Sequence, residues 1–409
     1  MPWLLRMLLN VSVVTLMAYA YVGWRVNQAL THLTSLPDPR RQQLILLTVV
    51  LLNLYPGTAL IAYLTGSDAW TIALRGGNRL MDIGLTYPFW IGLLVVAQLA
   101  PILLLIDIGR LALALLGKNP DGWTAWQATL TLLLAGAVCL YTAIRVYNDT
   151  QHIRIRERVI HATKLAPETP ELRIVHITDV QMDPRTGPPL VRAFVHKINE
   201  LNPDLVLFSG DLVTSGTEFI AQAATLLGQI KARHGVFACL GDHDYWADPQ
   251  GITRSLNEHG IVVIDDESRL IEIGSAQLEV TGVTNIYSRR PSADRLHQLA
   301  TSHNPRRVSI FLTHQPSEAL IEWAQRNGYD IFLAGHTHGG QVVLNYFGFR
   351  LTPGMLETRF ISGFYQVGQM LVSVSNGLGL TFAPLRFQAP AEITLLRLKP
   401  VETSHRVSE

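Results

Sequence analysis

The sequence predicts an α/β domain with two sheets, preceded by a region of four membrane-spanning helices. Three observations support this prediction. Long apolar stretches gather before residue 150, short apolar runs alternate with helical patterns after about residue 170, and five of these runs end at side chains that can bind metals. A charged fraction of only 16% beside an apolar fraction of 48% is unusual for a soluble protein, which agrees with this division.

The first region, residues 1–150, contains stretches long enough to cross a bilayer. A hydrocarbon core of ~30 Å requires roughly 20 apolar residues in a helix. The four stretches are 4–24, 44–64, 85–107 and 124–147. A removable signal peptide is the alternative for the first stretch, but a cleavage site of small residues is lacking and three more spans follow. We therefore expect a multi-pass region, with kinks at Pro56, Pro88 and Pro101.

Basic residues beside the spans predict their orientation, because cytoplasmic loops carry an excess of Lys and Arg. With four spans, both chain ends lie on one side of the membrane. The basic residues on that side are Arg6, Arg75, Arg79, Arg145, Arg154, Arg156, Arg158 and Lys164. Those on the other side are Arg25, Arg40, Arg41, Arg110 and Lys118. The imbalance favours a cytoplasmic C-terminal domain.

Composition also argues against several classes of function. No Asp, Glu or Lys lies in the middle of a span, so the usual mark of an ion pathway is missing and a transporter is disfavoured. The net charge of +1 makes no case for nucleic acid. Cys139 and Cys239 both lie in apolar runs, which indicates core residues and no disulfide framework.

A basic segment, 151–169, is predicted to link the two regions. Its "IRIRER" stretch at 153–158 could contact anionic headgroups or form a solvated linker. The domain is predicted over 170–400, followed by a tail at 401–409. Its strand-like runs are 172–178, 204–210, 235–241, 307–314 and 330–335, with helical patterns at 190–201, 218–232 and 317–328. Consecutive strand patterns at 269–283, 341–377 and 391–398 predict a second sheet packed on the first.

The chemistry is concentrated where the five runs end. In chain order these ends carry Asp179; Asp211; Asp242 with His243 and Asp244; His314; and His336 with His338. Each alone has a plain explanation, since an Asp after a strand is commonly a turn or cap residue and a lone His is commonly a core residue. Strand carboxyl ends border the ligand crevice of α/β sheets, however, so the five ends together predict a metal site.

Together the motifs D-V-Q at 179–181, G-D ending at 211, G-D-H-D at 241–244, His314 and G-H-T-H-G-G at 335–340 resemble the calcineurin-like metallophosphoesterase family, over roughly 170–398. The ending at 376–398 is similar to its membrane-associated, YkuE-like bacterial branch. The resemblance implies a four-layer αββα sandwich and a multi-pass protein of the bacterial inner membrane.

Carried over by motif, the resemblance implies a site for two divalent metal ions. Asp179 and His338, with Gln181 at a position where the family has histidine, would hold the first metal. His314, His336 and Asp242, the last at a position where the family has asparagine, would hold the second, and Asp211 would bridge both. His243 would protonate the leaving oxygen or stabilise the transition state, with Asp244 orienting its ring.

Such a site explains hydrolysis without a protein nucleophile. Two cations ~3.5–4 Å apart can clamp a phosphoryl group and acidify the water between them, which supplies an attacking hydroxide. The imidazole ligands favour Mn²⁺, with Fe²⁺ or Zn²⁺ as alternatives, over Mg²⁺. Gly339 and Gly340 would let the backbone bend sharply and a phosphate approach the metals.

The two departures from the family pattern bear on function. An amide is a weaker ligand than imidazole, so Gln181 predicts a labile first site, and the extra charge of Asp242 could favour diesters or pyrophosphates. We expect a membrane-anchored hydrolase of phosphate esters or diphosphates, with lipid-linked and nucleotide-linked molecules as candidate substrates. The alternative is an inactive phosphoesterase-like sensor or interaction module. Arg289 and Arg290 could clamp phosphate oxygens or belong to a solvated loop.

Overall fold

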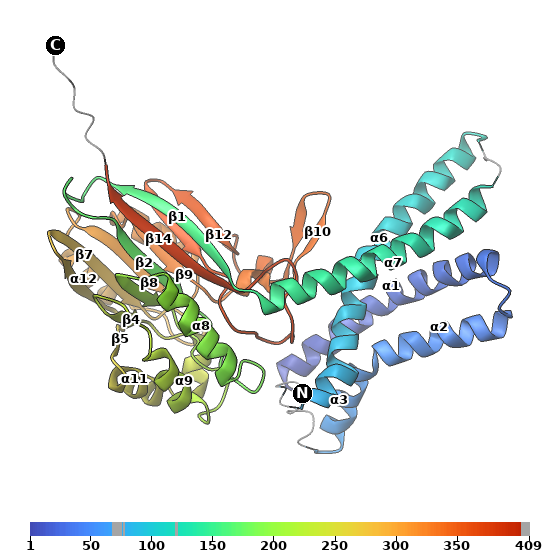
Figure 1. The fold of residues 1–409 in the computed structure, drawn as a ribbon, viewed down its shortest axis with the longest axis horizontal. Coiled ribbons are helices and arrows are strands. Elements are labelled where there is room, and N and C mark those ends of the chain that lie inside the picture. Colours follow the sequence, from blue (N-terminus) through green and yellow to red (C-terminus); the bar gives the residue numbers. More distant parts are fainter. Residues whose placement is uncertain (68–75, 77, 119–121, 402–409) are drawn as a thin grey trace, which may run out of the picture. The chain divides into compact units, whose positions relative to one another are not determined.

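The computed structural model describes residues 1–67, 76, 78–118 and 122–401 (Figure 1). Arg75 lies outside these residues, and so does the predicted tail 401–409 except for Val401. The chain forms two compact units. Met1–Asn148 and Phe382–Phe387 make up the first, here the helical unit, while Asp149–Thr381 and Gln388–Glu409 make up the second, the sheet unit.

The described part of the helical unit consists mainly of apolar helices. Its elements are α1 (Trp3–Leu33), α2 (Asp38–Leu52), α3 (Leu54–Leu64), α5 (Arg79–Met81), the π-helical turn η1 (Asp82–Thr86), α6 (Tyr87–Leu115) and α7 (Trp123–Gln151), the last of which ends in the sheet unit. Within the described residues, three helical stretches are long and apolar enough to cross a membrane, and a fourth crossing results if α2 and α3 form one bent span.

The break between α2 and α3 confirms one of the predicted proline effects. The two helices are bent by 53° at Asn53, and Pro56, which follows three residues later, has no N–H to donate to the carbonyl of Leu52. Pro88 instead lies in the first turn of α6, where its missing N–H is tolerated, and α6 continues through Pro101.

One short segment of the C-terminal half packs within the helical unit. Phe382 meets the ring of Trp90 edge-on at 5.3 Å between ring centroids, and Phe387 meets Tyr141 in the same manner at 6.1 Å. Hydrophobicity explains this placement, because the segment Phe382–Phe387 offers two large rings to apolar helices.

The sheet unit is built on two six-stranded sheets. The first has the order β1 (Arg154–Ala162), β14 (Glu392–Pro400), β2 (Leu172–Ile177), β3 (Leu205–Phe208), β4 (Val236–Ala238) and β5 (Ile261–Val263). The second has the order β12 (Gly363–Val367), β13 (Met370–Val374), β9 (Ile331–Ala334), β8 (Val308–Thr313), β7 (Ala276–Val283) and β6 (Glu267–Ile273). A separate hairpin pairs β10 (Leu344–Tyr346) with β11 (Phe349–Leu351).

Helices and short helical turns connect these strands. They are α8 (Pro188–Glu200), α9 (Ile220–Leu227), α10 (Asp242–Ala247), α11 (Pro249–Glu258), α12 (Ala293–Ser302), α13 (Glu318–Arg326), and the 3₁₀ turns η2 (His338–Gly340) and η3 (Pro353–Leu356).

Alternating side chains of the first sheet reach two different cores. Val175 and Ile177 of β2 belong to a cluster that includes Phe194 of α8 and residues of α9 and α11. Leu172 and Ile174 of the same strand belong instead to the cluster between the two sheets. A strand presents successive side chains to opposite faces, so β2 is covered by helices on one face and by the second sheet on the other.

The second sheet repeats this arrangement. Ile310 and Leu312 of β8 enter the cluster between the sheets, whereas Phe311 joins a cluster with Leu299 of α12 and Ile321 of α13. The layers are therefore helix, sheet, sheet, helix, which confirms the predicted αββα sandwich.

The segment expected to be a linker contains a strand instead. Residues Arg154–Ala162 form β1, which pairs in parallel with β14 at the edge of the first sheet. Ile155 packs against the core under this sheet, while Arg156 forms an ion pair of 2.7 Å with the buried Glu392. Apolar and charged residues alternate with a period of two from Ile153 to Arg156, which is the pattern of a half-buried strand.

Candidate metal centre

Parallel strands bring the five predicted motif ends to the same edges of the two sheets. In the first sheet β2 pairs with β3 and β3 with β4, all in parallel; in the second, β8 pairs in parallel with β9. Because parallel neighbours point their carboxyl ends the same way, the loops that follow them converge. The predicted side chains of these loops form the cluster described below.

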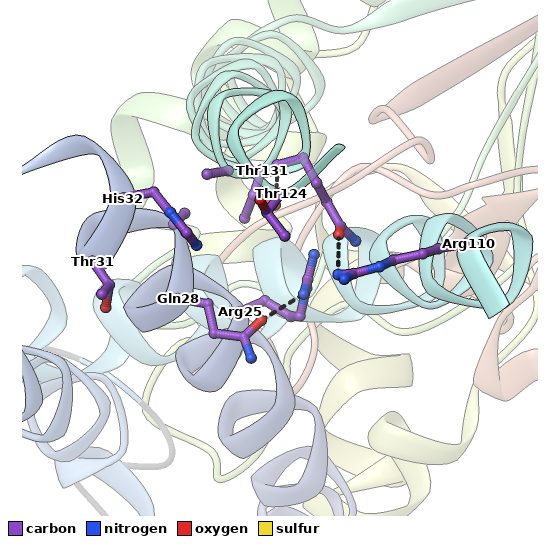
Figure 2. A pocket seen from close by; sticks show the side chains of 10 residues that line it. Arg25, Gln28, Thr31, His32, Arg110, Thr124 and Thr131 are labelled. Carbon is purple, nitrogen blue, oxygen red and sulfur yellow. Dashed lines mark hydrogen bonds between the residues drawn. The ribbon is translucent and has the colours of Figure 1, made fainter. Parts of the chain in front are cut away.

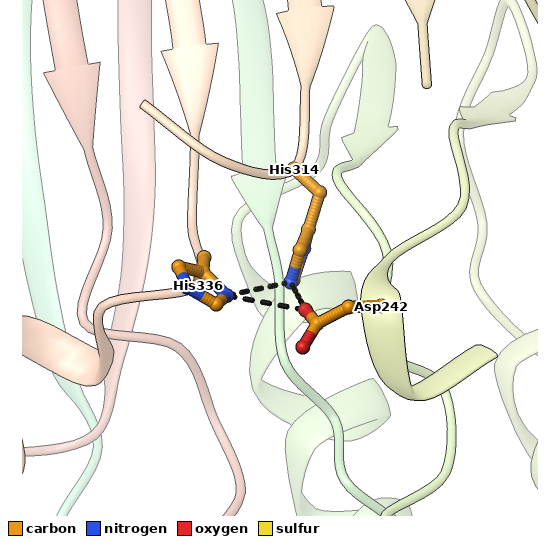
Figure 3. A group of neighbouring side chains, drawn as sticks. All are labelled: Asp242, His314 and His336. Atoms are coloured by element: carbon orange, nitrogen blue, oxygen red, sulfur yellow. Dashed lines mark hydrogen bonds and ion pairs between the residues drawn. The ribbon is translucent and has the colours of Figure 1, made fainter. Parts of the chain in front are cut away.

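Asp242, His314 and His336 form a tight group, shown in Figure 3. The Nε2 atom of His314 lies 2.8 Å from Oδ1 of Asp242. The Nδ1 atom of His336 lies 3.1 Å from the same oxygen and 3.3 Å from Nε2 of His314. Three donor atoms from three different loops thus face one point.

A second group of donor atoms joins Asp179, Asp211 and His314 within 4.8 Å of one another. His314 belongs to both groups, because its Nε2 also lies 3.3 Å from Oδ2 of Asp211. Nε2 of His338 lies 3.2 Å from Oδ1 of Asp179. The amide nitrogen of Gln181 donates to Oδ2 of Asp211 at 2.7 Å. The structure therefore brings together the seven residues that the sequence predicted as metal ligands.

His314 is prepared to act as a ligand through Nε2. Its Nδ1 donates to the carbonyl oxygen of Ser209 at 2.7 Å, so the neutral ring carries its lone pair on Nε2, which faces Asp211 and Asp242. Burial alone would lower the pKa of His314, but these carboxylates outweigh it and raise the pKa well above its usual value. The position therefore favours positive charge.

The other charged residues show the same coupling between burial and opposite charge. Burial opposes ionisation of Asp242, yet His314 and His336 hold its pKa well below the usual range. Burial also works against His336 as a cation, but Asp242 and Glu357 raise its pKa to about 9. The carboxylates and imidazoles thus compensate one another's charge at buried positions, where an unpaired charge is expensive.

The backbone of the site adopts an uncommon conformation. Positive φ angles occur at Asp179 (52°), Gln181 (50°), Asp211 (62°), His336 (68°) and His338 (50°). Non-glycine residues seldom occupy this left-handed region, and such positions cluster at functional sites. The sharp turns after β2, β3 and β9 aim these side chains inward, where an extended continuation of the strand would not.

Gly339 and Gly340 have the sharp bend that the sequence predicted, with φ angles of 63° and 86°. Close packing adds a second reason for glycine. A Cβ at Gly339 would lie 2.2 Å from Oδ1 of Asn376, and one at Gly340 would lie 1.9 Å from Oγ1 of Thr352. No side chain fits at either position without displacing a neighbour.

His243 lies at the rim of the site, and its ring contacts a different partner from the expected Asp244. Nδ1 of His243 contacts the carbonyl oxygen of Thr214, and the ring packs on Trp246 at 4.7 Å between centroids. The backbone N–H of His243 donates to Oδ1 of Asp211 at 3.0 Å. His243 is thus bonded to Asp211, a predicted metal ligand, through its backbone, while its half-buried ring contacts Thr214 and Trp246.

The expected contact between Asp244 and the His243 ring is wrong. The buried Asp244 carboxylate accepts backbone N–H groups of Asp211 and Leu212 at 2.8 Å each and of Gly241 at 2.9 Å. Burial, with the nearby charge of Asp211, raises its pKa to about 7. Asp244 therefore ties the loop after β3 to the loop after β4. Three converging N–H donors attract its carboxylate more strongly than a single ring nitrogen does.

Two residues near His336 were missed by sequence reasoning. Nε2 of His336 lies 3.0 Å from Oε2 of Glu357 and 3.1 Å from the hydroxyl of Tyr287. Neither residue follows a strand of the motif set, and no local pattern marks them. The motif spacing cannot predict these two contacts, because both residues lie in loops outside the five motifs.

Arg289, considered above as a phosphate clamp, is engaged by other groups. Its guanidinium bonds Asp265 at 2.7 Å and Asp266 at 2.8 Å, and it lies over the ring of Tyr245 at 5.6 Å. The guanidinium of Arg289 is therefore already held by two carboxylates and is not free to clamp a phosphate. The loop is also not a simple solvated segment. Arg290 is exposed.

The donor set fits a pair of divalent transition-metal ions. Imidazole nitrogens and carboxylate oxygens are the ligands that Mn²⁺, Fe²⁺ and Zn²⁺ share. Oε1 of Gln181 is buried without a hydrogen-bond partner among the described residues, and a bound cation would satisfy this oxygen. His314 and Asp211 join the two donor groups, in keeping with a dinuclear centre.

Comparisons with known proteins agree with this geometry. Residues 172–340 match the family described as Calcineurin-like phosphoesterase. The chain is 30% identical over 260 residues to an uncharacterized metallophosphoesterase of Helicobacter pylori strain J99, covering 62% of this chain and 66% of the relative. It is 29% identical over 286 residues to the transmembrane protein with metallophosphoesterase domain of Danio rerio, covering 67% and 63% of the two chains.

A third relative bears on the predicted branch. The chain is 28% identical over 260 residues to the uncharacterized metallophosphoesterase YkuE of Bacillus subtilis, covering 62% of this chain and 88% of that protein. For the Helicobacter and Danio proteins, the match spans less than two thirds of the relative's own length.

Proposed function

Because the chain belongs to the calcineurin-like phosphoesterase family, we propose that it is a membrane-anchored hydrolase that cleaves phosphodiester or pyrophosphate bonds with two metal ions. The observation that carries the proposal is the pair of donor groups that share His314. Their atoms are buried at the carboxyl ends of parallel strands, where an α/β sheet binds its ligands.

The ligands divide between the two ions as follows. Asp179, His338 and, more weakly, Gln181 hold the first ion. Asp242, His314 and His336 hold the second, and Asp211 serves both. Bound cations would polarise the phosphoryl oxygens and lower the pKa of a water at the site. Mn²⁺ is the preferred ion, with Fe²⁺ or Zn²⁺ as alternatives, since three imidazoles outnumber what a hard cation selects.

His243 acts on the leaving oxygen as a general acid. Its half-buried ring is open to the surface, while the contact between Nδ1 and the Thr214 carbonyl leaves Nε2 as the nitrogen available for proton transfer. Asp244 acts indirectly as a positioning residue, because its carboxylate fixes the backbone of Asp211 and Gly241.

An apolar hairpin beside the site supports a lipid-linked substrate. The segment from β10 to η3 exposes Phe347 by 80%, Phe349 by 75% and Leu356 by 92%, and it projects from the sheets of its own unit (Figure 1). Exposed patches of this kind mark interaction sites. A soluble nucleotide would gain little from this surface, whereas acyl chains would cover it.

Two contacts connect this hairpin to the metal ligands. Thr352, which follows β11, donates from Oγ1 to the carbonyl of Gly340 at 3.1 Å. Glu357, which follows η3, bonds His336 at 3.0 Å. An acyl chain on the hairpin would therefore hold its phosphate close to the second metal position.

The apolar helices hold the enzyme in the bacterial inner membrane as a multi-pass protein, with the sheet unit in the cytoplasm. The excess of basic residues beside the chain ends supports this orientation. Arrangement in a membrane also keeps the site within reach of substrates that never leave the bilayer.

One observation favours a second candidate, an inactive sensor or interaction module. Gln181 occupies a ligand position with an amide and turns its nitrogen to Asp211, so the first site could be too weak to fill. Hydrolysis measured on the detergent-purified full chain separates the two candidates. The panel contains lipid and nucleotide phosphodiesters and diphosphates with Mn²⁺, and Asp211→Ala is the control. Metal-dependent turnover that this variant lacks is expected; none on any substrate would favour the sensor.

A further inference from the structure

The helical unit contains a polar cavity that the proposed hydrolysis does not use. It has a volume of about 260 Å³ and is lined by residues of α1, α6 and α7, among them Arg25, His32, Arg110 and Gln127. In Figure 2 the side chains of Arg25 and Arg110 approach one another from α1 and α6. The cavity lies where α1 and α6 end and α7 begins.

The cavity carries more positive than negative charge. Arg25 is only 5% exposed, and its Nη2 lies 3.4 Å from Oδ1 of Asp107. Arg110 donates to Oε1 of the neutral Gln127 at 3.0 Å, and within the part of the chain that the structure describes no carboxylate pairs with it. Asp107 therefore compensates Arg25, while Arg110 is bonded by a neutral amide.

Part of this donor capacity is unused. Nε of Arg25 is buried and has no hydrogen-bond partner among the residues described. Gln127, itself 2% exposed, places its Nε2 2.7 Å from Oδ1 of Asp107, which fixes Oε1 as the acceptor that orients Arg110. Buried donors normally find partners, so a guanidinium with a free N–H beside a cavity indicates a missing acceptor.

Tryptophans place the cavity at the depth of lipid headgroups. Trp24 is next to Arg25, whose guanidinium lies 5.4 Å from the centroid of the Trp24 ring. Trp123 and Trp126 begin α7 with their centroids 5.1 Å apart. Tryptophan concentrates at the boundary between hydrocarbon and water, so the groups beside these rings meet phosphates more often than acyl chains.

We propose that this cavity binds a phosphate-bearing anion, with Arg110 and Arg25 as the donors. Guanidinium groups bind phosphate with two parallel N–H bonds, and basic pockets between membrane helices bind lipid headgroups. The ligand would join α1 and α6, because its oxygens would bond Arg25 of the first helix and Arg110 of the second. The alternative is a purely structural ion pair between Arg25 and Asp107 that holds two helices together. Such a pair would require neither Arg110 nor a cavity.

Two probes on the full-length protein test the proposal and identify the source of the phosphate. Native mass spectrometry measures how much phosphatidylglycerol the protein retains from nanodiscs that also contain neutral phosphatidylcholine. Thermal unfolding in detergent measures stabilisation by inorganic phosphate. Arg110→Gln should reduce binding by about tenfold, because a charge-assisted contact to the anion is lost. Arg40→Gln, an equal charge change at an exposed position, should not.

The outcomes are distinct. Loss of retained phosphatidylglycerol in Arg110→Gln alone supports a lipid ligand. A phosphate shift that Arg110→Gln removes, with no lipid preference, supports a free anion. The proposal is overturned if the natural protein retains both lipids equally and phosphate does not stabilise it, a comparison that requires no variant to fold. It is also overturned if Arg110→Gln and Arg40→Gln behave alike with both probes.

Discussion

The side-chain amide of Gln181 donates a hydrogen bond to Oδ2 of Asp211 over 2.7 Å. This oxygen also lies 3.3 Å from Nε2 of His314, so the amide proton competes with a cation for the carboxylate that joins the two donor groups. The remaining atom, Oε1, is a neutral and weak ligand. We therefore expect the first of the two proposed metal positions to be the weaker one.

Replacement of Gln181 by histidine should strengthen that position. We expect Gln181→His to raise activity at limiting Mn²⁺ and to converge with the natural protein at saturating Mn²⁺, because imidazole binds these ions better than an amide oxygen does. Metal content and hydrolysis of a soluble diester across a Mn²⁺ series check this. Gln366→His, an exposed position, controls for nonspecific binding by an added histidine. Activity that appears only in Gln181→His, at every Mn²⁺ level, would show the natural protein to be inactive.

His243 and Asp211 should separate metal binding from chemistry. His243→Ala is expected to keep both ions and to lose roughly 10²–10⁴ fold in turnover, the range for a general acid. Asp211→Ala should lose both ions, since this carboxylate belongs to the group with Asp179 and lies 3.3 Å from Nε2 of His314, which belongs to both groups. Metal analysis and turnover on the same preparations distinguish the roles, with the exposed His196→Ala as control. Equal metal loss in His243→Ala and Asp211→Ala would make His243 a ligand or a structural residue.

Asp244 should matter for stability more than for the chemical step. Asp244→Asn leaves one acceptor oxygen where three backbone N–H groups now bond the carboxylate. We expect about 1–3 kcal/mol less free energy of unfolding, the cost of buried unsatisfied donors. Thermal unfolding with Asp294→Asn, an exposed change of the same kind, as control measures it. Unchanged stability with lower turnover per bound metal would instead restore a role in orienting His243.

The apolar hairpin should distinguish embedded from soluble substrates. Phe347→Ser with Phe349→Ser is expected to lower kcat/KM for a vesicle-embedded diester by about tenfold or more, because each ring loses its burial against acyl chains. Turnover of a soluble diester should stay as it is, since neither ring contacts a metal ligand. Leu270→Ser, 46% exposed on β6, is the matched control. An equal fall on both substrates would mean that the hairpin supports the site and does not bind lipid.

The site residues that directly follow strands were predictable from the sequence. Each ligand follows an apolar run, and parallel pairing carries the ends of β2, β3, β4, β8 and β9 to common edges. Glu357 and Tyr287 reach His336 from loops with no such pattern. The partners of Asp244 are backbone N–H groups, which are invisible to any motif of side chains.

The layers of the fold were predictable from the sequence, but the edge strand β1 was not. The alternation of apolar runs and helices indicates two sheets, and both are present. β1 was missed because its arginines were interpreted as a solvated or headgroup-binding stretch, although Arg156 pairs with Glu392. The bend between α2 and α3 was predictable from Pro56, whereas α6 continues through both Pro88 and Pro101, where kinks were also predicted.

The segment Phe382–Phe387 means that the membrane anchor is not an exchangeable tag. The chain passes between its two units after Asn148, before Phe382 and again after Phe387, so a single cut does not divide the protein into its functional halves. A water-soluble truncation would carry Phe382 and Phe387 without Trp90 and Tyr141, the rings that now cover them, and would expose both to aggregation. Grafting foreign helices onto the sheet unit would require matching changes in this segment.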